Sequence, residues 1–254
     1  MIVYDMPQGT PEWHAARAGV CTASMFSTAR TRVGGLTDQQ AEYVKALKAG
    51  QNEREAMSLA GYKSKPRAAA IDAALEGRDT SEPGKTALDY AFGLAIERIS
   101  GLPLDDGFET YHTRRGHEME PVALDRYEIE TGRMVQRCGF VCTDDRKFGA
   151  SADGLVGADG GVEVKCWTDP VKLRAVLTGA DISEVRYQCL GGMWATGRKW
   201  WDFVLYCPAL DPIGRALTII RIDRDDNAID ALESDLLAFD RVVEGYRKQL
   251  EQAA

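Results

Sequence analysis

The chain has 254 residues, and its 31 Lys and Arg side chains stand against 39 Asp and Glu side chains, which gives a formal net charge of −8. With 44% hydrophobic and 8% aromatic residues, it has the composition of an ordinary globular protein and is not collagen-like, disordered or membrane-spanning. The first residues lack the basic end and the long apolar run of a signal peptide, so we expect a cytosolic protein with no membrane partner.

The spacing of the cysteines and the overall charge limit which metal sites and which modes of DNA binding are possible. The six cysteines contain no CxxC pair, which argues against a structural zinc site or an iron–sulfur cluster and predicts reduced, mostly buried thiols. The sequence pI near 5.1 provides no overall attraction to a polyanion. Any binding of DNA would therefore depend on a local basic lining or on metal ions.

A helical block follows the short N-terminal segment. Between residues 36 and 79 the sequence favours Ala, Lys, Glu and Gln, and it predicts three short helices. Thr37 and Gln40 fit the capping box of the first helix, while Pro66 and Gly77 mark the start and end of the third. The Ser, Pro, Gly and Thr residues of 79–86 then predict a linker.

The rest of the chain mixes strands and helices. Helices are predicted over 86–101 and about 114–131, after which a hydrophobic period of two predicts strands in CGFVCTD, FGASADGLVG and GVEVKCW. Helices at about 170–178 and 181–196, strands in WWDFVLYC and ALTIIRI, and a closing helix at about 226–252 follow. This order predicts an α/β (α+β) fold with a central mixed sheet flanked by helices and a small helical insert.

The segment SADGLVGADGGVEVKCW contains the most informative side chains. Asp153 follows one predicted strand, and Glu163 and Lys165 lie two residues apart on the next, so their side chains share a face. Two carboxylates together with a substrate phosphate suit Mg²⁺ or Mn²⁺, and such a site hydrolyses phosphodiesters. Lys165 would orient or help deprotonate the attacking water and offset charge in the transition state.

The same residues could also form a surface ion pair with no catalytic role. Glu-x-Lys pairs are common on exposed strands, where both side chains are solvated. Here the pair alternates with Val162, Val164 and Cys166, so both faces of the strand are expected to be partly buried, where a carboxylate and an ammonium without a role are costly. The spacing alone does not decide between the two interpretations.

Four blocks of sequence, in order, resemble one family. They are WHAARAGVCTAS (13–24), RGHEMEPVALDRYEIETG (115–132), SADGL with VEVKC, and YQCLGGMWATGRKWWDFVLYCP (187–208). Together they resemble the phage lambda exonuclease or YqaJ-type viral recombinase family of PD-(D/E)xK nucleases. The resemblance implies a restriction-endonuclease-like core over residues 1–35 and 80–254, because the block 36–79 is absent from the shorter family pattern.

The resemblance also implies roles for individual residues. Asp153, Glu163 and the main-chain carbonyl of Val164 would bind the metal, and Lys165 would be the catalytic lysine. Glu120 would be an outlying carboxylate that reaches the site, with its neighbour Glu118 as a rival. Gln188 matches the glutamine of the last block and would hold a phosphate or a water, although a polar position on a packed helix explains it equally well.

A second group matches residues that grip the terminal 5′-phosphate in the family. This group consists of Arg17, Ser24 and Ser151, whose guanidinium and hydroxyl groups suit phosphate oxygens. The family arginine that follows the lysine motif is replaced by Val171 here, and the adjacent Lys172 is the expected substitute. Trp13 is the tryptophan best placed by its motif to contact DNA, and His117 is the histidine expected near the site.

The 36–79 block is similar to the helix-turn-helix of phage terminase small subunits. In such a unit one helix enters the major groove while flanking basic residues, here Lys63, Lys65 and Arg67, contact phosphates. The block is electrically neutral, however, and a small helical insert can equally serve packing or subunit contacts. Both roles stay open from the sequence.

Taken together, the residues and the resemblance predict a Mg²⁺-dependent exonuclease, with Mn²⁺ as a substitute, that degrades double-stranded DNA ends 5′→3′ and leaves 3′ single-stranded overhangs. The resemblance further implies a ring-shaped homotrimer that works beside a single-strand annealing protein in phage or prophage recombination. Two alternatives are an endonuclease or DNA repair nuclease on the same core, and a non-enzymatic DNA-binding or packaging adaptor. Cutting of closed circular DNA distinguishes the first alternative, and a missing Mg²⁺ or Mn²⁺ effect on thermal stability distinguishes the second.

Overall fold

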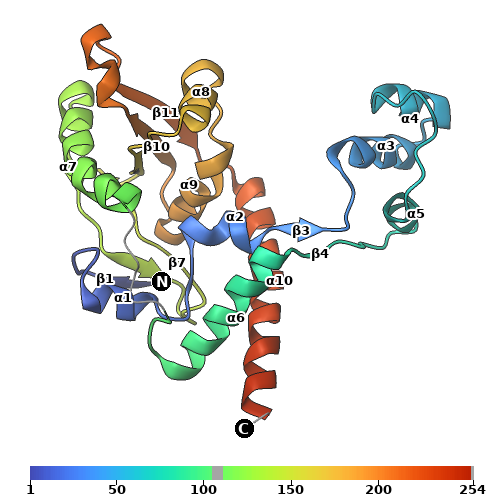
Figure 1. Ribbon diagram of the computed structural model, residues 1–254, viewed down its shortest axis with the longest axis horizontal. Coiled ribbons are helices and arrows are strands. Elements are labelled where there is room, and N and C mark those ends of the chain that lie inside the picture. The colour runs from blue at the N-terminus through green and yellow to red at the C-terminus, as the bar shows by residue number, and fades with distance from the viewer. Residues whose placement is uncertain (105–110, 253–254) are drawn as a thin grey trace. The chain divides into compact units, whose positions relative to one another are not determined.

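The computed structural model describes residues 1–104 and 111–252, and it divides into two compact units, Met1–Ala29 with Asp89–Ala254 and Arg30–Leu88. The larger unit holds two sheets, with strand orders β1-β6-β7-β2 and β11-β10-β9-β8-β5 (Figure 1). In the five-stranded sheet β9 and β10 are parallel and the other neighbours are antiparallel, so the predicted mixed sheet is confirmed. No helix among the described residues is long and apolar enough to cross a membrane.

The strands of the larger unit are mostly short. They are β1 (Ile2–Tyr4), β2 (Cys21–Thr22), β5 (Val135–Gln136), β6 (Phe140–Cys142), β7 (Phe148–Ala150), β8 (Gly154–Val156), β9 (Gly160–Lys165), β10 (Trp200–Tyr206) and β11 (Leu217–Asp223). Its helices are α1 (Pro11–Arg17), η1 (Ala23–Met25), α2 (Phe26–Ala29), α6 (Lys85–Ser100), α7 (Tyr111–Thr131), α8 (Pro170–Gly179), α9 (Ser183–Thr196), η2 (Pro208–Ile213) and α10 (Asp226–Gln252).

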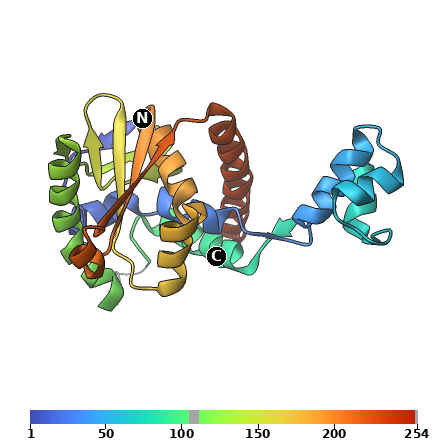
Figure 2. The same ribbon diagram turned by 90° about the horizontal axis from the view of Figure 1, so that it is seen from above.

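Helices cover both faces of the five-stranded sheet. Figure 2 shows α7 on one face and α9 on the other. On the α7 side, Ala123, Leu124 and Tyr127 pack against Val162 and Val164 of β9 in one hydrophobic core. On the α9 side, an added Cβ at Gly192 would lie 2.7 Å from the ring of Trp201, so the helix approaches the sheet closely only because this residue is glycine.

A buried acidic side chain, Asp202 of β10, ties the sheet to α7. It is 1% exposed, accepts a 2.6 Å hydrogen bond from the Tyr127 hydroxyl and is paired with the Arg221 guanidinium of β11. Asp202→Ala would leave the buried Tyr127 hydroxyl without its acceptor, and we expect it to lower the free energy of unfolding by about 1–3 kcal/mol in urea denaturation.

The matched control removes an acid of the same type from the surface. Asp211→Ala breaks only the exposed Arg126–Asp211 pair and should cost less than about 1 kcal/mol. Equal losses for Asp202→Ala and Asp211→Ala would contradict the structural role assigned to Asp202.

The smaller unit, Arg30–Leu88, contains α3 (Asp38–Lys48), α4 (Glu53–Leu59), α5 (Ala69–Leu75) and the two-stranded pair of β3 (Arg32–Val33) and β4 (Glu82–Pro83). The capping box expected at Thr37 and Gln40 is present, with the Gln40 side chain accepting from the Thr37 amide at 2.9 Å. The third helix starts at Ala69, two residues after the exposed Arg67, because Ala68 is extended; the predicted start at Pro66 was therefore wrong. Part of the predicted linker pairs as strand β4.

Three helices of the smaller unit pack on one another around a small core. The buried residues of this core are Tyr43, Val44, Ala46, Ala56, Ala60 and Ile71. Lys63, Lys65 and Arg67 are exposed, and Lys65 is paired with Glu53 at 2.5 Å. One of the three basic residues suggested for phosphate contact is thus already engaged within the unit.

Candidate active site

The central strand β9 presents an ion pair on the face that turns away from α7. Val162 and Val164 pack into the core with α7, and alternation places Glu163 and Lys165 on the opposite face. Lys165 Nζ donates to Glu163 Oε1 at 2.6 Å. The Glu163 side chain is 3% exposed and that of Lys165 is 27% exposed, so the carboxylate is deeply buried and the lysine is only partly exposed.

Asp153 lies in the bend between β7 and β8, beside this pair. Its Oδ2 accepts a 2.6 Å hydrogen bond from the Val164 amide, which holds the carboxylate against β9. The segment FGASADGLVG forms two strands, since β7 ends at Ala150 and β8 begins at Gly154, and Asp153 follows the first of them as predicted. The break between the two strands frees the Asp153 side chain from strand alternation and lets it approach the neighbouring strand.

The electrostatics show that acidic groups converge here. Burial raises the pKa of Asp153 well above its ordinary range, and the charges of Glu163 and Glu120 raise it further. Burial likewise raises the pKa of Glu163, although the Lys165 ammonium opposes the shift. At Lys165 burial disfavours the ammonium, but Glu163 and Asp153 outweigh that effect and raise its pKa.

Glu120 reaches the same place from α7. The helix continues through Pro121, so the proline does not end it and Glu120 keeps helical geometry. Glu120 Oε1 accepts from Arg137 Nη1 at 2.8 Å, and the same nitrogen lies 3.4 Å from the Asp153 carbonyl oxygen. Glu118, the rival carboxylate, is exposed and does not line the cavity described next.

A cavity of about 1010 Å³ joins these groups to the N-terminal segment. Among the sequence-predicted residues, its lining includes Trp13, Arg17, Ser24, Glu120, Ser151, Asp153, Glu163, Val164, Lys165 and Gln188. Lys172 of α8 is not in the lining; its ammonium is paired with Glu184 and lies 5.3 Å from the Trp167 ring centre. The fold therefore brings all the predicted site residues except Lys172 to one cavity.

The N-terminal wall of the cavity carries the group expected to grip phosphate. The guanidinium carbon of Arg17 lies 3.8 Å from the centre of the Trp13 ring, and Trp13 Nε1 donates to Ser151 Oγ at 3.0 Å. Arg17 Nη2 lies 3.5 Å from Thr22 Oγ1, which is 3.3 Å from Ser24 Oγ. Burial lowers the pKa of Arg17 to about 10, against the opposing charges of Tyr90 and Glu97, so its desolvated guanidinium favours an anionic neighbour.

The lining also includes residues that were not predicted, among them Arg137, His14 and Gln8. Arg137 comes from the segment between β5 and β6, His14 from α1 and Gln8 from the loop before it. Gln8 donates to the carbonyls of Cys138 and Ala152 at 2.9 and 2.7 Å and so joins the loop to the Asp153 segment. No motif marks Gln8 or Arg137, whereas His14 is the second residue of the block WHAARAGVCTAS. The expectation that only His117 of the histidines lies near the site was wrong.

The chemistry of the donors fits a magnesium ion. No group of three or more His, Cys, Asp or Glu side chains converges as a metal cage in the part of the chain that the structure describes. Magnesium, however, is usually held by one or two carboxylates while it keeps waters and takes up substrate phosphates. Asp153 and Glu163 meet this requirement, and a divalent cation would relieve the mutual repulsion that raises the pKa of Asp153.

Comparison with known proteins identifies the family. The sequence profile of the YqaJ-like viral recombinase domain matches residues 12–199. No curated protein matches the chain significantly. Among solved structures, the alkaline exonuclease LHK-Exo from Laribacter hongkongensis is similar, with a TM-score of 0.68, 28% identity and coverage of 96% of this chain and 97% of that one.

Two further structures agree with this. LHK-Exo in complex with dAMP has a TM-score of 0.69 at 28% identity, with 96% of this chain and 97% of that one covered. A phage related exonuclease from Haemophilus somnus 129PT shares the fold, with a TM-score of 0.50, 19% identity and coverage of 75% and 92%. The resemblance and the fold class inferred from the sequence are thereby confirmed. Because the family profile covers well over half of its length, this chain belongs to the YqaJ-like viral recombinase domain family.

Proposed function

We propose that the chain is a Mg²⁺-dependent exonuclease that degrades double-stranded DNA 5′→3′ from its ends and leaves 3′ single-stranded overhangs. The observation that carries the proposal is one cavity in which an acidic pair with a lysine, Asp153, Glu163 and Lys165, shares its lining with a cationic wall at Arg17. The family and its exonuclease neighbours support a nuclease over a DNA-packaging adaptor.

The acidic side of the cavity would carry the chemistry. Asp153, Glu163, the Val164 carbonyl and Glu120 would hold Mg²⁺, or Mn²⁺ in its place. When bound, the ion supplies Lewis acidity toward the scissile phosphate. Lys165, held beside Glu163, orients the attacking water and offsets the charge that develops on the phosphate.

The other residues of the lining would place the DNA. The Gln188 amide can donate to a phosphate or accept from the water. Arg17, with the hydroxyls of Ser24 and Ser151, would bind the terminal 5′-phosphate, and Trp13 forms the platform on which Arg17 rests. Binding of the end at this wall sets the distance from the terminus to the bond that is cut, which supports removal of nucleotides one after another.

The wider assembly belongs to the same proposal. A homotrimeric ring would enclose duplex in a channel with a few basic side chains, while the outer face keeps the net charge of −8. Such an enzyme would act in the cytoplasm of a bacterial host beside a single-strand annealing protein, in phage-type recombination.

The test compares DNA substrates that differ only at their ends. With Mg²⁺, we expect nucleotide release from linear duplex, faster from 5′-phosphorylated than from 5′-hydroxyl ends, and none from covalently closed circles. Cutting of the circles would show an endonuclease on the same core. Release that is insensitive to EDTA would remove the metal from the proposal.

Arg137 provides an independent prediction, because it is paired with Glu120 at 2.8 Å while 55% of its side chain is exposed. Arg137→Ala removes a cation that competes for Glu120 and that would contact DNA phosphate. We therefore expect Mn²⁺ to bind several-fold more tightly by titration calorimetry and duplex DNA to bind several-fold more weakly, because an exposed ion pair is worth up to about 1 kcal/mol, which is about fivefold in an equilibrium constant. Arg126→Ala, on the surface of α7, the helix that carries Glu120, should change neither.

A role for Arg137 in holding the fold alone would have a different signature. Loosening of the cavity would weaken the binding of both Mn²⁺ and DNA, so parallel losses in Arg137→Ala would contradict the prediction.

A further inference from the structure

The loop between α1 and β2 is fastened to α6 through one glycine. The Gly19 amide donates to Glu97 Oε2 at 2.8 Å, and the Gly19 carbonyl accepts from Arg98 Nε at 2.9 Å. Gly19 has a φ of +73°, and an added Cβ would lie 2.8 Å from Arg98 Cγ. Two consecutive side chains of α6 therefore hold both polar groups of a residue that has no room for a side chain.

The fastened loop carries the cationic wall of the cavity. Arg17 is two residues before Gly19, and Thr22, which contacts both Arg17 and Ser24, is three residues after it. Tyr90, also on α6, accepts a 3.3 Å hydrogen bond from the Thr22 amide. The positions of Arg17 and Ser24 are thus set by how firmly α6 holds this short segment.

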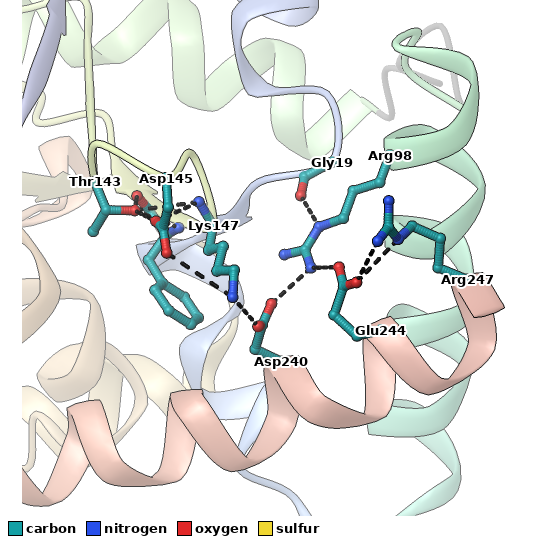
Figure 3. Close-up of polar contacts among 9 residues, drawn as sticks. Gly19, Arg98, Thr143, Asp145, Lys147, Asp240, Glu244 and Arg247 are labelled. Atoms are coloured by element: carbon teal, nitrogen blue, oxygen red, sulfur yellow. Dashed lines mark hydrogen bonds and ion pairs between the residues drawn. The ribbon is translucent and has the colours of Figure 1, made fainter.

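Arg98 is in turn anchored to α10 (Figure 3). Its Nη1 donates to Asp240 Oδ1 at 2.6 Å and to Glu244 Oε1 at 3.0 Å. Asp240 is 4% exposed and is also paired with Lys147 Nζ at 2.8 Å. The Lys147 carbonyl accepts a hydrogen bond from the Cys21 amide at 2.9 Å. Asp240 is therefore also connected, through Lys147, to strand β2, which follows the loop.

The shape of the guanidinium explains why arginine fits this place. One planar group donates from Nε to the loop carbonyl and from Nη1 to the two acids of α10, which a lysine ammonium cannot do with a fixed geometry. Neither Arg98 nor Asp240 is among the residues that line the site cavity. The hydrogen bond from Arg98 to Gly19 connects them to the loop that does line it.

We infer that Arg98 is a positioning residue for the DNA end: through Gly19 it holds Arg17 and Ser24 where they meet the terminal phosphate, and it does not touch the DNA. The inference rests on the proposed function, since it assigns Arg98 to the end-binding wall of that same cavity. Two parts of the protein would then have separate roles. The residues of β9 carry out hydrolysis, and the contacts of Arg98 with Gly19 and with α10 determine how the DNA end is recognised.

The test disturbs the Gly19–Arg98 contact from each side. Arg98→Lys keeps a cation next to Asp240 but loses the Nε donor to Gly19, and Gly19→Ala pushes the loop away from Arg98. Kinetics would be measured with full-length protein on linear duplex bearing 5′-phosphate or 5′-hydroxyl ends. We expect both variants to raise KM for phosphorylated ends about tenfold and to lose most of the preference for phosphate, with kcat within about twofold of wild type.

Two controls match the variants. Arg247→Ala removes the other arginine bound to Glu244, which lies on α10 and not on the loop at Gly19. Gly132→Ala places alanine at another positive φ, +67°, with no atom within 4 Å of the new Cβ. Both should keep the wild-type preference. Thermal unfolding of each variant checks that it is folded.

The outcomes separate the inference from the proposed function. If either contact variant keeps the wild-type preference, or loses kcat equally on both substrates, Arg98 has no positioning role, while exonuclease activity of the wild type still stands. If the wild type itself shows no metal-dependent release or no preference for the phosphate, the proposed end-binding wall fails and the inference falls with it.

Discussion

Replacing Lys165 by alanine is expected to lower kcat on linear duplex with Mg²⁺ by on the order of 10³-fold, with a much smaller change in KM. Lys165 is the cation nearest the acidic pair, with its Nζ 2.6 Å from Glu163 Oε1 in a cavity large enough for a DNA end. Its loss removes positive charge where the phosphate gains negative charge. Release of acid-soluble nucleotides over time measures the effect.

Two controls accompany this substitution. Lys199→Ala removes a lysine whose side chain is 72% exposed and paired with Asp159, and it should leave the rate unchanged. Lys165→Arg keeps a cation beside the buried Glu163, so it distinguishes the loss of charge balance from the loss of the amine itself. Undiminished release by a folded Lys165→Ala protein would contradict the assignment of the site.

Asp153→Asn is expected to abolish the Mn²⁺-dependent rise in Tm and, in EDTA at pH 7, to raise the stability of the metal-free protein by on the order of 1 kcal/mol. The cause of the stabilisation is the crowding of buried acids, since burial, Glu163 and Glu120 all raise the pKa of Asp153. Asparagine has no charge and can still accept the hydrogen bond from the Val164 amide. On this account the wild-type protein keeps Asp153 for metal binding although its carboxylate lowers the stability of the metal-free fold.

The raised pKa of Asp153 also predicts how the stabilisation by Asp153→Asn changes with pH. When the folded pKa of a carboxyl group exceeds its unfolded value, the native state binds more protons, and stability falls as pH rises from the unfolded pKa toward the folded one. The advantage of Asp153→Asn in EDTA should therefore shrink as the pH is lowered toward the ordinary pKa of aspartate, about 3.9. Asp159→Asn, on an exposed turn, should show neither effect, and a variant less stable than wild type at pH 7 would contradict the account.

Local rules predicted much of this architecture. The Thr37–Gln40 capping box forms because it needs only contacts within one helical turn. Glu163 and Lys165 share a face because side chains alternate along any strand. The helix predicted at about 114–131 is present as α7, and Pro121 lies inside it without ending it.

Other features had no local signal. Arg137 and Gln8 enter the cavity from loops far from the acidic motif, and nothing in their immediate sequence shows where those segments meet. Lys172 is next to the position of the missing arginine in the sequence, yet it pairs with Glu184 on the following helix. Adjacency along the chain did not determine which cation faces the site.

The sequence by itself determined the strand period, the Thr37–Gln40 capping box, the family motif and the positions of the acidic pair with its lysine. These depend on covalent geometry and on interactions within a few residues, so they survive in any fold that contains the segments. Only the tertiary structure decided that Asp153 bonds to the Val164 amide, that Arg137 holds Glu120 and that Arg98 joins Gly19 to Asp240. Each of these contacts joins separate elements, and their placement depends on how all the apolar faces of the larger unit are buried together.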